Sequence, residues 1–343
     1  MASVSVLGAG TWGIALARML AKTGHDVTVW SAIGSELDSL KETRKHPKLP
    51  QMILPENIVY EKDLETACAR KDILLFVVPS VFVRQTAAQA KPFIPQGQII
   101  VDASKGLEDG TFMTMTQVIE DELGDGMRLV ALSGPTHAEE VSVDLLTTIV
   151  ASSLDTEAAK TVQEVFSNEN MRVYTNTDVF GVQLCAALKN VIALAAGIST
   201  GIGFGDNARA AVITRGLAEM ARLGRAMGCS PETFMGLAGL GDLVVTCTSE
   251  HSRNNRCGQL MGRGLTAEQA VKEVGMVVEG LNALPAAVAL SQKYHVEMPI
   301  TAAVDALVNR HADVREAAAA LILSQNGPAR LLTQGTDDRE DDW

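Results

Sequence analysis

The sequence predicts an α/β domain built on a doubly wound parallel sheet, followed by an all-helical domain. Up to about residue 175, short apolar segments alternate with helix-like segments, the pattern of a parallel sheet covered by helices. After about residue 178 the strand-like segments almost stop, and helix-like segments follow one another. The expected division is a sheet domain over 1–178, a helical domain over 179–330 and an acidic, solvated tail over 331–343.

The strands of the first half are expected where segments are short, β-branched and nearly continuously apolar, as strands buried on both faces are. These segments are Ser3–Leu7, Asp26–Trp30, Ile73–Val78, Gln98–Asp102, Arg128–Leu132 and Thr147–Ala151. Two weaker segments are expected as edge strands, namely Asn57–Tyr60 and Met171–Tyr174. The helices expected between the strands are Ile14–Lys22, Val81–Ala90 and Thr156–Phe166.

The helices of the second half carry recognisable end signals. The expected helices are Phe180–Ile198, Asn207–Met227, Thr266–Val274, Asn282–Lys293, Thr301–Val308 and Asp313–Leu323. Ser230 before Pro231 is typical of a helix start, and Gly228 stands where a helix end needs left-handed backbone. Reciprocal capping boxes are expected at two starts, Thr266 with Gln269 and Asp313 with Glu316.

Composition excludes several classes of protein. The 343 residues carry 41 acidic and 29 basic side chains, a net charge of −12, so general affinity for nucleic acid or anionic membranes is not expected. The sequence has no uninterrupted run of about 18 apolar residues, so a membrane-spanning helix is not expected. The five cysteines form no CxxC pair, which argues against a metal site or a disulfide framework and favours a cytoplasmic protein.

Residues 8–13 form a GxGxxG motif between the first expected strand and the first expected helix. Gly8 permits a tight turn, Gly10 leaves room for a pyrophosphate, and Gly13 lets the helix pack closely on the strand. The helix N-terminus offers unpaired N–H groups and the positive end of its dipole to phosphates. We therefore expect a dinucleotide at this turn, the alternative being an ordinary glycine-rich turn.

The residue that usually distinguishes NAD from NADP is missing. An NAD site normally has Asp or Glu at the end of the second strand, where it binds the ribose 2′-hydroxyl. Here that strand ends in Trp30-Ser31-Ala32. A small serine tolerates a 2′-phosphate that a carboxylate would repel, which slightly favours NADP. The choice between the two cofactors stays open.

Two lysines stand where the predicted fold would bring them to a ligand. Lys105 follows the strand that ends at Asp102, and Ser133–Thr136 follows the next strand, so both lie at the carboxyl edge of the sheet. Lys189 stands in a helix that is apolar on nearly every side, so its ammonium group needs a partner or a chemical role. For Lys105 and Ser133–Thr136 the alternatives are a solvated lysine and a plain turn. For Lys189 they are a lysine that reaches the surface along its alkyl chain and a lysine held by a structural carboxylate. His137 is more often structural than a proton carrier in such a loop.

A second polar group of residues lies in the helical half. A glycine-rich turn ends in Asp242, and Ser252-Arg253-Asn254 follows at an expected helix start. An arginine beside a helix N-terminus suits a phosphate monoester, although the same segment also fits a solvated loop. Glu279, at the head of the next helix, is ambiguous in the same way.

Taken together, these segments closely resemble the bacterial-type NAD(P)-dependent glycerol-3-phosphate dehydrogenases. The matching stretches follow the family order over about residues 3–325: GAGTWGIALA from Gly8, ASKGLE from Ala103, SGPTHAEEV from Ser133, VQLCAALKNVIALAAG from Val182, GIGFGDNARAAVITRGLAEMARLG from Gly201, GLAGLGDLVVTCTS from Gly236, SRN from Ser252 and VVEG from Val277. The resemblance implies a Rossmann-type first domain, a second domain like the C-terminal domain of 6-phosphogluconate dehydrogenase, and a homodimer.

The resemblance also implies an activity and a set of site residues. The activity is reversible reduction of dihydroxyacetone phosphate to sn-glycerol 3-phosphate for phospholipid synthesis, with Lys189 as proton donor and acceptor at the C2 oxygen. The residues implied around the small phosphorylated substrate are Lys105, Gly134, Thr136, Lys189, Asp242, Ser252, Arg253 and Asn254. Those expected at the NAD(P) cofactor, from the motif and the resemblance together, are Gly8, Gly10, Thr11, Trp12, Gly13, Lys105, Ala138, Arg253, Val277 and Glu279.

Two positions depart from the family pattern. Position 136 is often serine, and Thr136 keeps the hydroxyl, whereas the basic residue often found after the second strand is absent at Ser31-Ala32. The chemistry itself is reasonable, because a cation beside a ketone oxygen stabilises the charge that hydride transfer builds there. A lysine with its reference pKa of about 10.4 is mostly protonated at neutral pH and ready to donate.

Two other classes of protein stay open. One is another dehydrogenase with the same two domains, acting on a hydroxy acid or on ketopantoate, which would need an arginine placed for a carboxylate. The other is a redox sensor that binds a dinucleotide without catalysis, which would leave Lys189 in its apolar helix unexplained.

Overall fold

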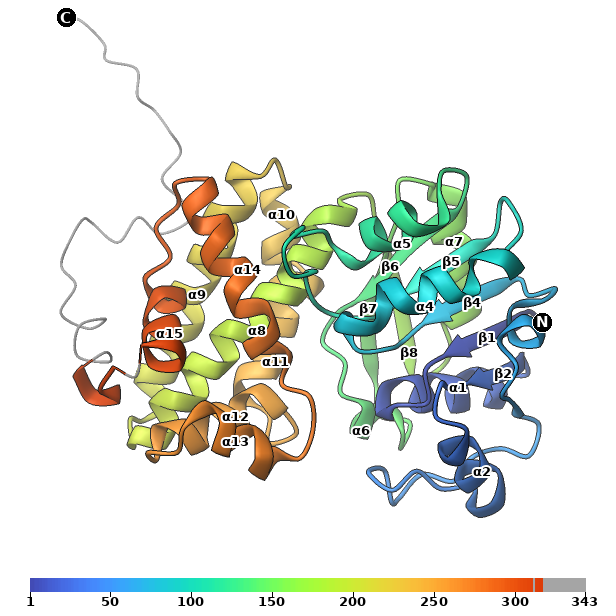
Figure 1. The fold of residues 1–343 in the computed structure, drawn as a ribbon, viewed down its shortest axis with the longest axis horizontal. Helices are drawn as coiled ribbons and strands as arrows, with labels where there is room; N and C mark the ends of the chain where they lie inside the picture. The colour runs from blue at the N-terminus through green and yellow to red at the C-terminus, as the bar shows by residue number, and fades with distance from the viewer. Residues whose placement is uncertain (311, 317–343) are drawn as a thin grey trace, which may run out of the picture.

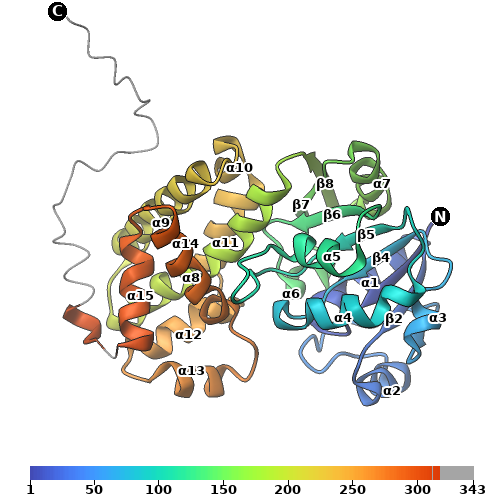
Figure 2. The same cartoon turned by 45° about the horizontal axis from the view of Figure 1, so that its top comes forward.

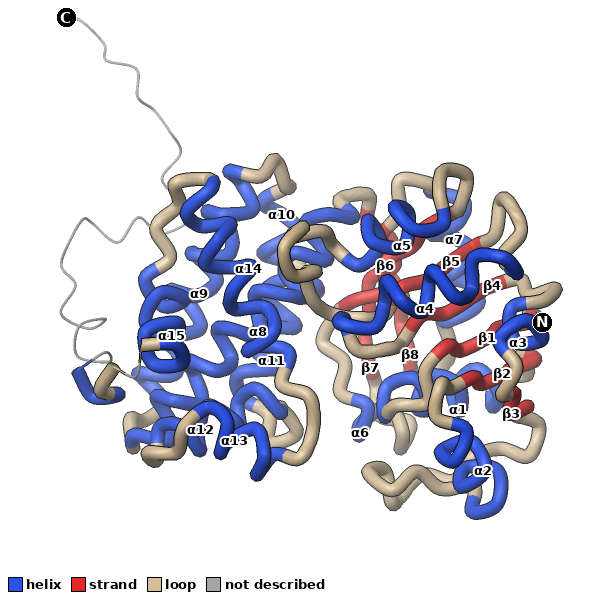
Figure 3. The backbone as a smooth tube through the Cα atoms, viewed as in Figure 1, coloured by secondary structure: helices blue, strands red, loops and turns tan. Residues whose placement is uncertain are grey.

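The computed structural model describes residues 1–310 and 312–316 of the chain. These residues form two halves that lie side by side, and the chain enters the helical half after the last strand (Figure 1). All strands drawn in Figure 3 belong to the half that contains the N-terminus, whereas the other half consists of helices and loops. The expected order, a sheet domain followed by a helical domain, is confirmed.

The described residues of the first half form one sheet of eight strands, in the order β3-β2-β1-β4-β5-β6-β7-β8. The strands are β1 Ser3–Leu7, β2 Asp26–Trp30, β3 Val59–Glu61, β4 Ile73–Phe76, β5 Ile99–Asp102, β6 Arg128–Ser133, β7 Thr147–Ser152 and β8 Met171–Asn176. Every expected strand is present, and the two weaker ones are the edge strands β3 and β8. The strand order reverses between β1 and β4, the switch point at which open α/β sheets bind ligands.

One pair of strands corrects the expectation of a fully parallel sheet, because β7 runs antiparallel to β6. The connection between them, residues 134–146, contains only the four-residue helix α6 Ala138–Val141. Such a helix spans roughly 6 Å, far less than the roughly 20 Å of a six-residue strand. The chain therefore turns back beside β6 instead of crossing over the sheet.

Helices cover both faces of the sheet, which is therefore doubly wound as predicted. They are α1 Thr11–Lys22, α2 Gly34–Thr43, α3 Leu64–Cys68, α4 Val83–Ala90, α5 Met115–Leu123, α6 Ala138–Val141 and α7 Thr156–Phe166, with short 3₁₀ turns at Ser80–Phe82 and Lys91–Phe93. One apolar cluster joins the sheet to α1, α2, α6 and α7, and another joins it to α3, α4 and α5. The sequence patterns missed α2 because it buries only Leu37 and Leu40.

The helical half is built around a central helix, α8, with the other helices packed about it (Figure 2). The helices are α8 Val179–Ile202, α9 Asp206–Ala226, α10 Pro231–Met235, α11 Asp242–Thr248, α12 Arg253–Gly262, α13 Ala267–Val274, α14 Glu279–Lys293 and α15 Pro299–Asn309, with a π-helical turn at Leu237–Gly241. By length and composition α8 is apolar enough to cross a membrane, but 89% of its apolar window is buried inside the protein. It is the core helix of this half.

Glycines let α12 lie directly on α8. A methyl group at Gly258 would lie 2.2 Å from the carbonyl oxygen of Leu194, and one at Gly197 would lie 2.1 Å from that of Asn255. These are backbone atoms, which cannot move aside as a flexible side chain could. The two helices therefore meet backbone to backbone, and this contact sets the position of the N-terminus of α12 relative to the middle of α8.

The loop between β5 and α5 joins the two halves. Its Leu107 and Phe112 pack into the apolar core of the helical half. Behind them Gln183 of α8 accepts a hydrogen bond from the backbone N–H of Thr116 at 2.9 Å and donates one to the Thr116 hydroxyl at 2.6 Å. Lys105 lies at the start of this loop, so it is held at the junction of the two halves.

The predicted helix ends have mixed outcomes. The Thr266–Gln269 capping box is present, and Gly228 has a left-handed φ of 84°. The helix start at Ser230-Pro231 is confirmed, because Ser230 is the N-cap of α10. Its hydroxyl donates to the charged carboxylate of Glu232 and makes no capping bond to the backbone. Of the helix expected over Asp313–Leu323 only residues 313–316 are described, and the remainder and the tail over 331–343 lie outside the described residues.

Candidate active site

A cleft lies between the glycine-rich turn of the sheet half and the starts of α12 and α14 in the helical half. Its lining includes twelve of the predicted site residues: Gly10, Thr11, Trp12, Lys105, Thr136, Ala138, Lys189, Ser252, Arg253, Asn254, Val277 and Glu279. The other four, Gly8, Gly13, Gly134 and Asp242, are not part of this lining, although Gly134 and Asp242 both contact Lys105. Residues from far apart in the sequence are thus brought together at one site.

The glycine-rich turn has the geometry that a dinucleotide requires. Gly8 has a φ of 130°, and a methyl group there would lie 2.6 Å from the carbonyl oxygen of Val77. At Gly13 a methyl group would lie 2.1 Å from the carbonyl oxygen of Gly8, so α1 packs tightly on the turn. A methyl group at Gly10, by contrast, would meet no atom within 4 Å beyond its chain neighbours, and Gly10 offers no side-chain cap to α1. The open side of the turn therefore presents a bare helix N-terminus to the cleft, which fits a pyrophosphate.

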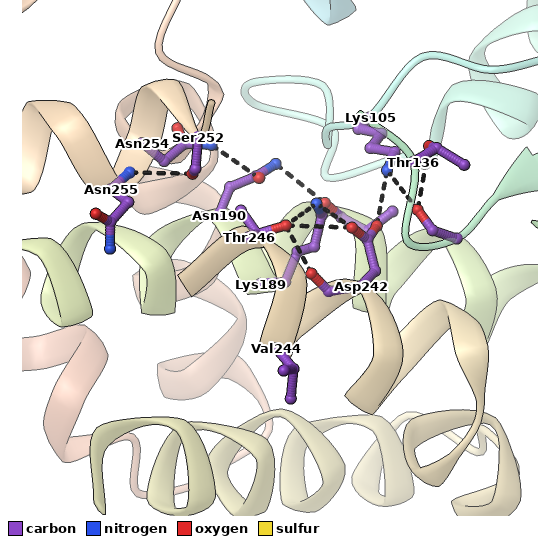
Figure 4. A network of polar contacts seen from close by, with 12 residues as sticks. Lys105, Thr136, Lys189, Asn190, Asp242, Val244, Thr246, Ser252, Asn254 and Asn255 are labelled. Atoms are coloured by element: carbon purple, nitrogen blue, oxygen red, sulfur yellow. Dashed lines mark hydrogen bonds and ion pairs between the residues drawn. The ribbon is translucent and has the colours of Figure 1, made fainter. Parts of the chain in front are cut away.

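Two lysines from different halves share one buried carboxylate. The ammonium nitrogen of Lys189 lies 2.6 Å from Oδ1 of Asp242, and that of Lys105 lies 2.7 Å from Oδ2. Figure 4 shows the two ammonium groups converging on this carboxylate. Lys105 also donates to the carbonyl oxygen of Gly134 at 3.1 Å, and the Thr136 hydroxyl donates to the same oxygen at 3.2 Å. Two cations against one anion leave the base of the cleft positive.

The start of α11 positions the partners of Lys189. The preceding π-helical turn is tightly packed, since a methyl group at Gly239 would lie 2.2 Å from the carbonyl oxygen of Phe234. Asp242 begins α11, and Thr246 follows one turn later on the same side of the helix. The Thr246 hydroxyl accepts from Lys189 at 2.7 Å and donates to the carbonyl oxygen of Asp242 at 2.6 Å. The Lys189 ammonium group is thus fixed by two acceptors.

Burial and mutual attraction shift the pKa values of these groups in opposite senses. Burial is the main cause that lowers the pKa of Lys189, which is about 8; Asp242 acts to raise this pKa, and Lys105 acts in the same sense as burial. For Asp242, burial would raise the pKa, but the two ammonium groups outweigh it and hold the pKa below its usual value. Lys189 therefore stays mostly protonated at neutral pH and yields its proton more readily than an exposed lysine.

A second chain of hydrogen bonds links α8 to the starts of α12 and α14. Asn254 donates from Nδ2 to Oδ1 of Asn190 at 2.9 Å and accepts from the backbone N–H of Gly280 at 2.8 Å. Ser252 is the N-cap of α12, because its hydroxyl accepts from the backbone N–H of Asn255 at 3.2 Å. The expected helix start at Ser252-Arg253-Asn254 is confirmed, and its N-terminus faces the cleft.

Two further contacts lie at the mouth of the cleft. Arg253 donates from Nη1 to the carbonyl oxygen of Val277 at 3.1 Å, which leaves the rest of its guanidinium fork available to a ligand. Glu279 begins α14 and accepts a hydrogen bond from the Ser80 hydroxyl at 2.9 Å. Ser80 follows β4, so this contact connects the sheet half to the helical half beside the cleft.

Sequence reasoning missed several residues that line the cleft. Asn190 is the neighbour of Lys189 in an apolar helix, and its polarity was a usable signal. Thr246 stands four residues after Asp242, a spacing that puts both on one side of a helix. The other lining residues outside the predicted set are Val77, Val78, Pro79, Ala103, His137, Glu139, His251 and Met276, of which the sequence analysis considered His137 and interpreted it as structural. Burial and then Lys189 lower the pKa of His137, which favours its neutral form, and its interpretation as a structural residue stays a prediction.

The described part of the chain contains no cluster of three or more His, Cys, Asp or Glu side chains that could hold a metal ion. All five cysteines are buried and free of disulfides. The side chains that line the cleft supply ammonium, guanidinium, imidazole, carboxylate, hydroxyl and amide groups.

A doubly wound sheet with GxGxxG at its switch point, facing a buried lysine on an apolar helix, defines a nicotinamide dinucleotide-dependent dehydrogenase. The family models refine this class: residues 3–159 match the N-terminal domain, and residues 178–319 the C-terminal domain, of NAD-dependent glycerol-3-phosphate dehydrogenase. The chain belongs to the NAD-dependent glycerol-3-phosphate dehydrogenase family.

Individual relatives agree with the family models. A protein of Lactobacillus delbrueckii subsp. bulgaricus named glycerol-3-phosphate dehydrogenase [NAD(P)+] 2 is 60% identical over 330 residues, which cover 95% of this chain and 98% of the relative. A protein of Agathobacter rectalis named glycerol-3-phosphate dehydrogenase [NAD(P)+] is 48% identical over 94% of this chain and 96% of its own. The crystal structure of glycerol-3-phosphate dehydrogenase from Coxiella burnetii superposes with a TM-score of 0.90 at 37% identity, covering 94% and 99% of the two chains.

Proposed function

We propose that this chain catalyses reversible hydride transfer between NAD(P)H and C2 of dihydroxyacetone phosphate, giving sn-glycerol 3-phosphate for phospholipid synthesis. The observation that carries the proposal is the Lys189 ammonium group, which lines the cleft although its side chain is only 5% exposed. Neither a solvated lysine nor a purely structural ion pair requires an ammonium group at the surface of a ligand cleft. A redox sensor would give this group no role.

Lys189 is the proposed proton donor and acceptor at the C2 oxygen. When bound, the reduced cofactor would supply the hydride for C2. Lys189 gives its proton to the C2 oxygen, so that the ketone gains two electrons and two hydrogens in all. Asp242 and Thr246 hold the ammonium group at 2.6 and 2.7 Å and limit the positions it can take. Lys105 adds a second positive charge, which stabilises the oxygen as its negative charge develops.

The phosphate of the substrate is proposed to bind at the start of α12. Arg253 offers its guanidinium fork, and the N-terminus of α12 offers backbone N–H groups beside it. Asn254 and Asn190 connect this end of the cleft to the neighbour of Lys189 along α8. The remaining residues proposed around the substrate are Lys105, Gly134, Thr136, Asp242 and Ser252.

The cofactor is proposed to bind across the mouth of the cleft. Its pyrophosphate would lie at the turn formed by Gly8, Gly10 and Gly13, against the first turn of α1 with Thr11 and Trp12. Its nicotinamide end would lie toward Lys189. The further residues proposed along it are Lys105, Ala138, Arg253, Val277 and Glu279.

The proposal also covers the domain division, the localisation and oligomeric state, and the partners of the chain. We divide the chain into a dinucleotide-binding domain over 1–178 and a helical catalytic domain that begins with α8 at Val179. The two family models, which match 3–159 and 178–319, support this division. We also propose a cytoplasmic homodimer, the usual state of the proteins that the sequence resembles, with no nucleic-acid partner and no membrane insertion.

The proposed function is tested by following reduced-cofactor absorbance with three substrates. We expect dihydroxyacetone phosphate to be reduced and ketopantoate and unphosphorylated dihydroxyacetone to react at least about 100-fold less efficiently, because Arg253 and the α12 N-terminus recognise the phosphate. Preferential reduction of ketopantoate would identify the other dehydrogenase class. Dinucleotide binding without turnover of any of the three would favour the sensor.

A further inference from the structure

The end of β2 lies directly beside the glycine-rich turn. The backbone N–H of Gly8 donates to the carbonyl oxygen of Trp30 at 2.9 Å, and Leu7 of β1 pairs with Trp30 of β2. The residue after β2, Ser31, is 8% exposed. In dinucleotide-binding sheets the adenosine ribose lies at this strand end, where an acidic residue normally binds its hydroxyls.

A carboxylate reaches this position from α2 instead of from the strand. Glu36 lies in the first turn of α2, and its Oε2 accepts a hydrogen bond from the Ser31 hydroxyl at 3.0 Å. The Ser31 hydroxyl oxygen in turn accepts from the backbone N–H of Ile33 at 3.1 Å. The tight turn between β2 and α2 therefore ties the Glu36 carboxylate to the strand end, while the Glu36 residue itself remains exposed.

The charge of this carboxylate is not cancelled by an ion pair. Among the ion pairs of the described residues, none involves Glu36. Lys62, which lies against Gly34 at the start of α2, is paired with Asp38 at 2.7 Å. Burial lowers the pKa of His46, and Lys48 acts in the same sense, whereas Glu36 and the backbone of Ala9 oppose the shift, so the imidazole favours its neutral form.

We propose that Glu36, held by Ser31, binds the adenosine ribose hydroxyls of the cofactor and makes the enzyme prefer NAD to NADP. The carboxylate accepts hydrogen bonds from the 2′- and 3′-hydroxyls, and it repels a 2′-phosphate. Ser31 alone, as the sequence shows it, favours the opposite preference. The proposal deepens the proposed function, because it rests on a dinucleotide binding at the GxGxxG turn, but it does not depend on which ketone is reduced.

The test compares cofactor binding by the wild type, Glu36→Gln and Glu42→Gln. Glu42 lies near the other end of α2 and is exposed, so its substitution makes the same charge change away from the strand end. Dissociation constants for NADH and NADPH are measured by cofactor fluorescence without substrate. We expect the wild type to bind NADH more tightly, Glu36→Gln to lower the NADH-to-NADPH selectivity at least about 10-fold, and Glu42→Gln to leave it unchanged.

Two results would overturn the proposal: a wild type that binds NADPH as tightly as NADH, or equal selectivity in Glu36→Gln and the wild type. A Ser31→Ala variant provides a second arm, because loss of the tether should lower selectivity in the same direction by a smaller factor. Since no substrate is present, a selectivity change without dihydroxyacetone phosphate turnover would count against the proposed function alone.

Discussion

Lys189 and Asp242 lie 53 residues apart in the sequence, yet the Lys189 ammonium nitrogen is 2.6 Å from a carboxylate oxygen of Asp242 in a nearly solvent-free setting. Neither group would be tolerated there without the other, because an unpaired buried charge is costly. Lys105 contacts the second oxygen of the same carboxylate, so the three groups together keep one net positive charge. This arrangement suits a group that must give a proton to a substrate oxygen and recover it afterwards.

The first prediction concerns pH. Because burial lowers the pKa of Lys189 to about 8, reduction of the ketone, which needs the protonated lysine, should slow as the pH rises through about 8. Oxidation of the alcohol needs the neutral lysine and should slow as the pH falls through the same region. Initial rates of reduction and of oxidation are measured between pH 6 and 10 at saturating cofactor. If the two rates changed with pH in the same direction, the proposed role of Lys189 would be contradicted.

Asp242→Asn should move this profile in a defined direction. Asp242 raises the pKa of Lys189, so removing its charge should shift the pH dependence of both reduction and oxidation toward lower pH by about one unit or more. Circular dichroism checks that the variant is folded. A folded variant with an unshifted profile would show that Asp242 does not set the protonation of Lys189.

The second prediction separates the Thr246 hydroxyl from its bulk. Thr246→Val keeps the shape of the side chain but removes the acceptor that lies 2.7 Å from Lys189, so kcat should fall about 10-fold with little change in substrate KM. Thr246→Ser keeps the hydroxyl and should retain most of the activity. If valine and serine variants behave alike, the hydroxyl does not position the lysine.

The third prediction concerns the phosphate of the substrate. Arg253→Ala should raise the KM for dihydroxyacetone phosphate about 10- to 100-fold, because a charge-assisted, bidentate contact is lost. Arg256→Ala is the matched control: it lies three residues further along α12, is exposed and does not line the cleft. Equal KM values for the two variants would show that the substrate phosphate does not bind at Arg253.

The fourth prediction tests the contact between α8 and α12. Gly258→Ala would place a methyl group 2.2 Å from a backbone oxygen of α8, so it should lower the free energy of unfolding by about 3 kcal/mol, although helix propensity alone favours alanine by about 1 kcal/mol. At Gly205, before α9, φ is −82° and an added methyl group would meet nothing within 4 Å, so alanine should change the free energy of unfolding by less than about 1 kcal/mol. Urea denaturation compares them; a stable Gly258→Ala would mean that the helices can separate.

Local patterns in the sequence were enough to predict much of the site. The strand, GxGxxG turn and helix at the N-terminus form one continuous segment, so their geometry follows from short-range rules. Lys105 and Ser133–Thr136 were predicted at the same edge of the sheet because each follows a strand. In the structure β5 and β6 are parallel neighbours, and Lys105 donates to the carbonyl oxygen of Gly134. The burial of Lys189 followed from the apolar character of its helix.

Long-range packing was not accessible in the same way. The sequence pointed to Asp242 and Lys189 separately, but their pairing depends on how α11 packs on α8. The antiparallel direction of β7 was not predicted, because it depends on the connection from β6, whose helix α6 is only four residues long. The glycines of α8 and α12, Gly197 and Gly258 among them, were visible in the sequence, but only the packed helices explain them.

The most direct test of the catalytic role of Lys189 is the turnover number of Lys189→Ala with dihydroxyacetone phosphate, measured beside its dissociation constant for the reduced cofactor. Loss of the proton donor should lower kcat about 1000-fold or more, while cofactor binding changes by less than about threefold, because the cofactor is proposed to be held mainly at the glycine-rich turn. A folded Lys189→Ala that binds cofactor and keeps a kcat near the wild-type value would contradict the assignment of Lys189 as the proton donor.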